Sequence, residues 1–154
     1  MVIRILVLQE MEENINNLQL SLEPYGYDLT IVDKISQAMS VLARNEMDVI
    51  VSAVFLRNES VFDFLRLCKA DSRTAEKPFI FYCSKHSAFA RSVRDGLQIA
   101  ARAMGADKYI TMEDFNGAAL RDEIEDTIQR CERAAARRES GNRNAEEMRA
   151  SMAQ

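Results

Sequence analysis

The segment Asp48–Leu56, with the sequence DVIVSAVFL, limits the possible folds of this chain more than any other stretch. Its residues are almost all apolar, several are β-branched, and polar residues flank it on both sides, which predicts a strand buried on both faces. Strands of this kind occur in parallel sheets that helices cover on each side. The segment therefore predicts an α/β fold whose binding sites lie beyond the carboxyl ends of the strands.

The rest of the chain alternates between strand and helix patterns, as such a fold requires. Further strands are predicted at Val2–Leu8, Tyr27–Val32, Phe79–Cys83 and Lys108–Met112. Helices are predicted between them, over residues 36–45, 61–70 and about 88–104, after the first strand, and from about Asn116 onward. We expect a doubly wound, five-stranded parallel sheet in the order 2-1-3-4-5, with helices on both faces.

Charge and hydropathy exclude several classes of function. The chain has 154 residues and a net charge of −4, which argues against general binding to nucleic acid. Arginines near the C-terminus alternate with glutamates, which is typical of a solvated helix face. No apolar run is long enough to span a membrane, and the N-terminus enters a strand pattern without a leader sequence. A cytoplasmic protein without a membrane contact is expected.

The residue types that bind metals and nucleotides are sparse. The chain has three cysteines and one histidine, at Cys68, Cys83, Cys131 and His86. An odd number of cysteines without C-x-x-C spacing predicts reduced thiols, and a lone histidine in a polar loop predicts a surface residue. The first strand is followed by acidic residues that would repel phosphate, at Glu10, Glu12 and Glu13. No cofactor is therefore expected.

Four landmarks occur in a fixed order along the chain: an apolar first strand that ends in a polar pair, DVIVSAVFL, RLCKADSRTAEKPFIFYCS and GADKYIT. With these landmarks, Val2 to about Arg133 resembles the receiver domain of bacterial two-component response regulators. The resemblance implies a receiver-like domain over residues 1–133. Ser140, Gly141 and Asn142 are expected to break the last helix, so that residues 134–154 form a helical extension or a flexible tail or linker.

The active-site positions depart from the family. Receivers bind magnesium through two acidic residues after the first strand and accept phosphate on an aspartate that ends the third. A Thr or Ser ends their fourth strand, and a lysine ends the fifth. The resemblance places these positions at Gln9, Glu10, Ala53, Cys83 and Met112. A methyl group cannot accept phosphate, and one carboxylate is a poor ligand set for magnesium. A degenerate phosphorylation site, with no catalytic residue and no metal, is therefore expected.

The resemblance thus implies a pseudo-receiver, a phosphorylation-independent module for protein interaction or regulation in signal transduction. One alternative is a small-molecule or redox sensor that uses the pocket around Glu10, Ala53, Cys83 and Met112. Another is an unorthodox phosphoacceptor, which the missing aspartate and lysine oppose. Ser52 is a weak substitute because strand alternation turns it away from the site.

A second expectation concerns docking. In the family, partners bind the face made by the fourth helix, fifth strand and fifth helix, and Tyr109 matches the aromatic whose rotation reports phosphorylation. The span from Cys83 to Gly105 exceeds that of usual receivers by about two helical turns, or about seven residues. We expect a protein partner at this face, through Phe89, Val93 and Tyr109. The last helix is a further candidate, for a homodimer contact or for a connection to another domain. The alternative is a solvated extension without a partner.

Overall fold

The structure, a computed structural model, describes residues 2–84 and 88–153, and the side chains of residues 2–84 and 95–153. Its strands are β1 (Arg4–Leu8), β2 (Asp28–Val32), β3 (Val49–Ala53), β4 (Phe79–Cys83) and β5 (Lys108–Thr111). They form a parallel sheet in the order β2-β1-β3-β4-β5, as expected from the sequence.

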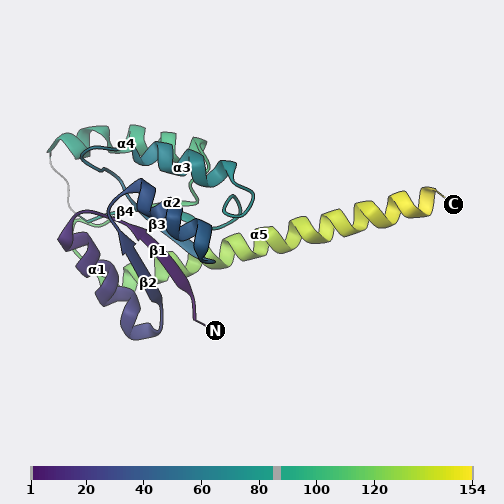
Figure 1. The fold of residues 1–154 in the computed structure, drawn as a ribbon, viewed down its shortest axis with the longest axis horizontal. Coiled ribbons are helices and arrows are strands. Elements are labelled where there is room, and N and C mark those ends of the chain that lie inside the picture. The colour runs from purple at the N-terminus through teal and green to yellow at the C-terminus, as the bar shows by residue number, and fades with distance from the viewer. Residues whose placement is uncertain (1, 85–87, 154) are drawn as a thin grey trace.

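The helices cover both faces of this sheet (Figure 1). They are α1 (Glu12–Leu22), the short 3-10 helix η1 (Glu23–Tyr25), α2 (Ile35–Arg44), α3 (Val61–Ala70), α4 (Ala88–Ala103) and α5 (Gly117–Met152). One apolar cluster joins α2, α3 and α4 to the sheet, and includes Ala38, Phe64 and Ala101. A second cluster joins α1 and α5 to the opposite face, and includes Leu18, Leu120 and Ile124. This is the doubly wound arrangement.

The strand β3 is the centre of the sheet, and every one of its residues is buried. It pairs with β1 on one side and β4 on the other, which confirms the prediction of a strand covered on both faces. It is shorter than the apolar segment predicted, because Val54, Phe55 and Leu56 lie beyond its end. Leu56 is nevertheless 3% exposed, so the apolar run continues into a buried loop.

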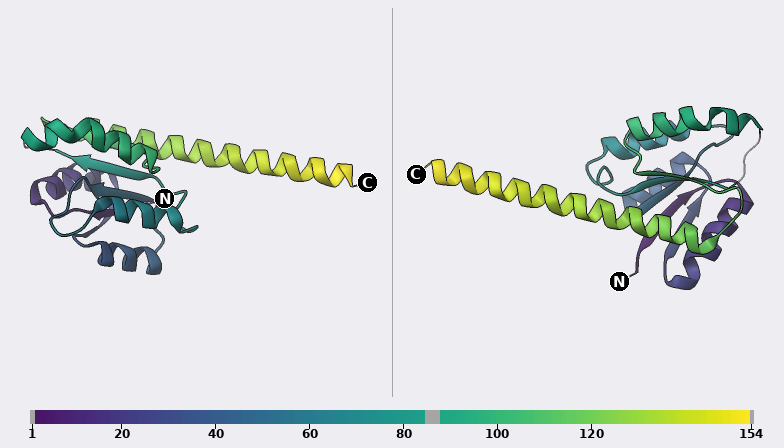
Figure 2. Two further views of the ribbon diagram at one scale, coloured as in Figure 1. Left: turned by 90° about the horizontal axis from the view of Figure 1, so that it is seen from above. Right: turned by 180° about the vertical axis from the view of Figure 1, so that it is seen from behind.

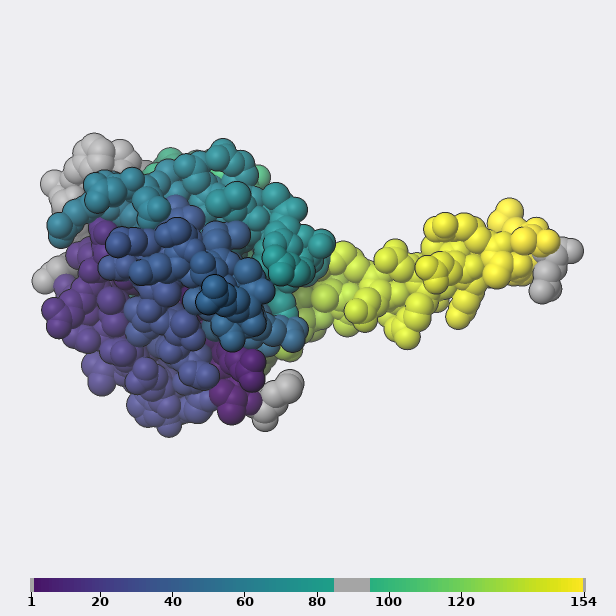
Figure 3. All heavy atoms as spheres, in the orientation of Figure 1, coloured from purple at the N-terminus to yellow at the C-terminus, as the bar shows by residue number. Residues whose placement is uncertain are grey.

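The last helix differs from the sequence-based prediction. The expected break at Ser140–Asn142 is absent, and α5 continues without interruption to Met152. Ser, Gly and Asn are poor helix formers, with a cost of up to about 1 kcal/mol for Gly. They are tolerated because the packed first half of α5 nucleates the helix, after which each added residue gains a hydrogen bond. The C-terminal segment of α5 projects from the body of the domain (Figures 2 and 3).

Within the described residues, no helix is both long and apolar enough to cross a membrane. The longest helix, α5, carries charged residues along its whole length.

Candidate functional site

The sheet brings the predicted site positions to one edge. Gln9 and Glu10 follow β1, Ala53 and Cys83 end β3 and β4, and Met112 follows β5. The parallel register aligns these strand ends, since Ser52 pairs with Leu8, Ala53 with Tyr82, and Cys83 with Thr111. The carboxyl edge is therefore the candidate site, as the fold predicts.

The position that the resemblance assigns to the phosphoacceptor holds a buried methyl group. Ala53 is 2% exposed and belongs to the apolar cluster that also includes Leu8 and Ile50. The neighbouring Ser52 is buried as well, and its hydroxyl donates a hydrogen bond of 2.9 Å to the carbonyl oxygen of Ala53. Neither residue presents a nucleophile to solvent, so neither can take the role of an aspartate.

The two positions after β1 form hydrogen bonds within the protein. Gln9 is 2% exposed, and its side-chain Oε1 accepts from the backbone N–H of Met11 at 3.2 Å. Glu10 Oε1 accepts from the backbone N–H of Arg57 at 3.0 Å, which joins the β1–α1 loop directly to the β3–α3 loop. These residues do not fit the magnesium ion that the resemblance implies, because a buried amide and a methyl group replace two of its carboxylates. Among the described residues, no cluster of three His, Cys, Asp or Glu is arranged to hold a metal.

A pocket of about 530 Å³ lies beside Glu10. It is lined by residues of the β1–α1, β2–α2 and β3–α3 loops: Glu10, Asp33, Lys34, Leu56, Arg57, Asn58 and Glu59. Glu59 Oε2 accepts from the backbone N–H of Ile35 at 3.0 Å, and so satisfies one of the free donors at the start of α2. Of the residues expected to form one pocket, only Glu10 lines this cavity; Ala53, Cys83 and Met112 do not.

The end of β4 is fixed by polar contacts that the sequence did not reveal. Ser84 is 4% exposed, and its backbone N–H donates to Asn14 Oδ1 at 3.2 Å, while its hydroxyl donates to the same oxygen. Asn17 Nδ2 donates to the hydroxyl of Tyr82 at 3.1 Å. Burial raises the pKa of Tyr82, so the phenol stays neutral. The only sequence signal was two asparagines, three residues apart, within the apolar pattern of α1.

Within the described part of the chain, no disulfide joins any of the three cysteines. Cys83 is half-buried at the end of β4, and Cys68 is buried in α3. Burial raises the pKa of Cys68 to about 12, so its thiol stays protonated and poorly reactive near neutral pH.

Three of the crystal structures that the fold resembles illustrate the relationship. The chemotaxis response regulator CheY4 of Vibrio cholerae has 16% identity and a TM-score of 0.66, over 82% of this chain and 99% of that one. A CheY-like response regulator receiver domain protein from Methanospirillum hungatei has 17% identity and a TM-score of 0.69, over 87% and 99%. The signal receiver domain of an HD domain-containing protein from Pseudomonas fluorescens has 19% identity and a TM-score of 0.70, over 88% and 93%. This chain has the receiver fold. Neither a protein-family model nor a curated protein matches its sequence.

The receiver fold allows the expected docking face to be located. It is made by α4, β5 and α5, which follow one another in the chain. The side chains of Phe89 and Val93, and all of His86, lie outside the described residues. Tyr109 is 8% exposed, and its ring centroid lies 6.0 Å from that of Phe81 in the core. The ring packs inward and leaves little of Tyr109 exposed on this face, so a contact of Tyr109 with a partner stays a prediction.

Proposed function

We propose that this chain is a pseudo-receiver, a module of the receiver fold that regulates a protein partner without aspartyl phosphorylation. The observation that carries the proposal is the buried methyl group of Ala53 at the end of β3. Phosphoryl transfer needs a nucleophile and cations that offset the developing charge. Here Glu10 is bonded to the backbone of Arg57, and Met112 occupies the position of the lysine.

The first prediction concerns phosphorylation. After incubation with magnesium and acetyl phosphate, the intact mass of the chain is expected to remain unchanged, because no carboxylate occupies the acceptor position. A receiver domain that retains the aspartate serves as the positive control in the same buffer. An acid-labile phosphoryl adduct on the wild-type chain would contradict the proposal, and peptide mapping would then identify the acceptor.

The second part of the proposal concerns the partner-binding face. In the part of α4 whose side chains are described, the large apolar residue with the greatest exposure is Ile99, at 70%, so we propose it as the anchor on this face. We expect the replacement Ile99→Asp to weaken partner binding by about tenfold, since an apolar anchor at an interface contributes more than about 1 kcal/mol. Pull-down with the full chain, followed by titration of the captured protein, measures this effect.

A matched control exists on the opposite face of the sheet. Leu20 in α1 is 65% exposed, so Leu20→Asp makes the same chemical change at nearly the same exposure. It is expected to leave partner binding unchanged. If both variants retain the partner, or if both lose it equally, the α4 face is not the docking face. Capture of a second copy of the chain would identify the partner as the protein itself.

A further inference from the structure

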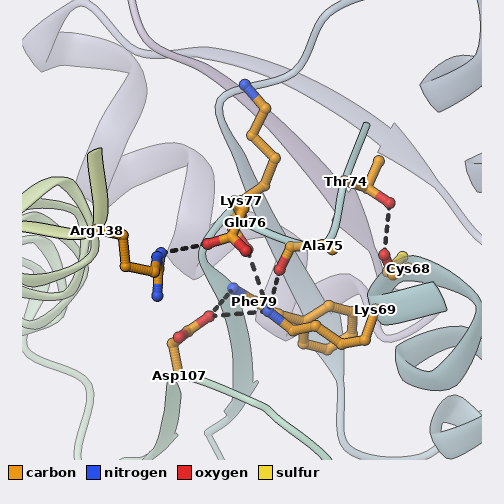
Figure 4. A network of polar contacts seen from close by, with 9 residues as sticks. All are labelled: Cys68, Lys69, Thr74, Ala75, Glu76, Lys77, Phe79, Asp107 and Arg138. Atoms are coloured by element: carbon orange, nitrogen blue, oxygen red, sulfur yellow. Dashed lines mark hydrogen bonds and ion pairs between the residues drawn. The ribbon is translucent and has the colours of Figure 1, made fainter. Parts of the chain in front are cut away.

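A network of polar contacts lies at the amino edge of the sheet, opposite the degenerate site (Figure 4). Its centre is the α3–β4 loop, residues 71–78. Thr74 Oγ1 donates to the carbonyl oxygen of Cys68 at 2.6 Å, and the backbone N–H of Ala75 donates to Asp71 at 2.8 Å. Lys69 Nζ donates to the carbonyl oxygens of Ala75 at 3.1 Å and of Lys77 at 3.4 Å. These bonds hold the loop in one conformation.

Asp107 attaches this loop to the sheet. Its Oδ2 accepts from the backbone N–H of Phe79, the first residue of β4, at 2.8 Å. The same oxygen accepts from Lys69 Nζ at 3.4 Å. Burial, together with the nearby carboxylate of Asp107, raises the pKa of Cys131 in α5 to about 11. The loop, the sheet and α5 thus meet around one carboxylate.

The helix α5 meets the network a second time, two turns later. Arg138 forms an ion pair with Glu76 of the α3–β4 loop, and the close view shows the two side chains pointing toward each other (Figure 4). Cys131 and Arg138 are seven residues apart, which places them on the same face of the helix. The face of α5 that packs on the sheet therefore also contacts the α3–β4 loop.

Beyond Arg138 the helix loses this support. The side chains of residues 139–153 are exposed, apart from the half-buried Ala145. The segment 139–152 projects from the body in all views of the molecule (Figures 1–3). The fourteen residues of this segment span about 21 Å, because an α-helix rises about 1.5 Å per residue. A change of about 20° in the direction of the helix would move its end by about 7 Å.

We infer that the α3–β4 loop sets the direction in which the segment 139–152 of α5 leaves the domain, through the ion pair between Glu76 and Arg138. The two side chains are 65% and 58% exposed, and exposed ion pairs contribute only about 0–1 kcal/mol to stability. The direction of the segment can therefore change without unfolding of the domain. Because the loop is itself held in one conformation, the ion pair ties the helix to a fixed point of the domain.

The test is the orientation of the segment in solution, measured by backbone residual dipolar couplings on the full chain. In the wild type, couplings of residues 139–150 are expected to fit the alignment tensor of the sheet. In Glu76→Gln, they are expected to fall in magnitude, while those of the sheet stay the same. Glu139→Gln is the matched control, because it removes an exposed glutamate next to Arg138 without touching the loop. It is expected to leave all couplings unchanged.

A charge exchange completes the test. Glu76→Arg combined with Arg138→Glu restores opposite charges, and the couplings of the segment are expected to return toward the wild-type values. Three results would overturn the inference: couplings that are already averaged in the wild type, an unchanged segment in Glu76→Gln, or no recovery in the exchanged pair. Both residues are exposed, so these substitutions are expected to leave the domain folded. The couplings of the sheet check this in each variant.

Discussion

Replacing Phe64 with alanine is expected to lower the free energy of unfolding by about 3–5 kcal/mol. Phe64 lies in α3 with no exposed surface, and its ring centroid is 5.5 Å from that of Phe79. Phe79 lies 5.2 Å from Phe81, which in turn lies 6.0 Å from Tyr109. The aromatic rings thus connect α3 to β4 and β5, and the substitution would leave a cavity at one end of this row.

Phe55→Ala is the matched control for this prediction. Phe55 is 69% exposed in the β3–α3 loop, so the same chemical change is expected to alter stability by less than about 0.5 kcal/mol. Urea unfolding of the full chain, followed by circular dichroism, measures both variants. Equal losses in the two would contradict the packing described. If Phe64→Ala does not fold, Phe64→Leu leaves a smaller cavity and should show a smaller loss in the same direction.

The fold could be predicted because buried strands give a clear pattern of apolar residues in the sequence. The segment Asp48–Leu56 indicated a central parallel strand, and the other elements alternate around it at lengths that fit one fold. The ends of the elements were less certain. The strand β3 stops at Ala53, while the apolar run continues through the buried Leu56. An apolar run of sequence indicates that a segment is buried, but it does not indicate whether the segment is a strand or a loop.

The continuation of α5 could not be predicted from local sequence. Ser140, Gly141 and Asn142 disfavour a helix individually, yet the helix passes through them. Its support comes from its packed first half, where Leu120 and Ile124 share an apolar cluster with Ile5 of β1, at the other end of the chain. Interactions over such separations depend on the fold, and no window of sequence contains both partners.

The candidate site, like the fold, was predictable from the sequence only in part. The five positions that the resemblance assigned to the site lie at one edge of the sheet, because the register of parallel strands fixes where the strands end. It did not predict the bond between Glu10 and Arg57, which are 47 residues apart, or the contact of Asn14 with Ser84, 70 residues apart. The inward position of Tyr109 depends on the rotation of a side chain, which the sequence does not determine.

The substitution Ala53→Asp at the end of β3 is expected to lower the free energy of unfolding by about 2–4 kcal/mol at pH 7. Ala53 is 2% exposed in an apolar cluster, and a buried carboxylate without a partner is costly. Burial would raise the pKa of the introduced carboxyl above the value of about 3.9 that it has in the unfolded chain. The folded variant then binds more protons than the unfolded one, so its stability falls as the pH rises above about 4.

The difference in stability from the wild type should therefore be smaller at pH 4 than at pH 7 in urea unfolding. Ala136→Asp is the control, because Ala136 is exposed on α5 and the same change there costs only about 0.5 kcal/mol in helix propensity. Adding Met112→Lys supplies a cation at the position where receivers carry their lysine. If the pseudo-receiver interpretation is right, the double variant recovers part of the loss, which a double-mutant cycle measures as a coupling energy. A loss no larger than that of Ala136→Asp would show that the Ala53 environment accepts a carboxylate, and would contradict the cost of burial argued here.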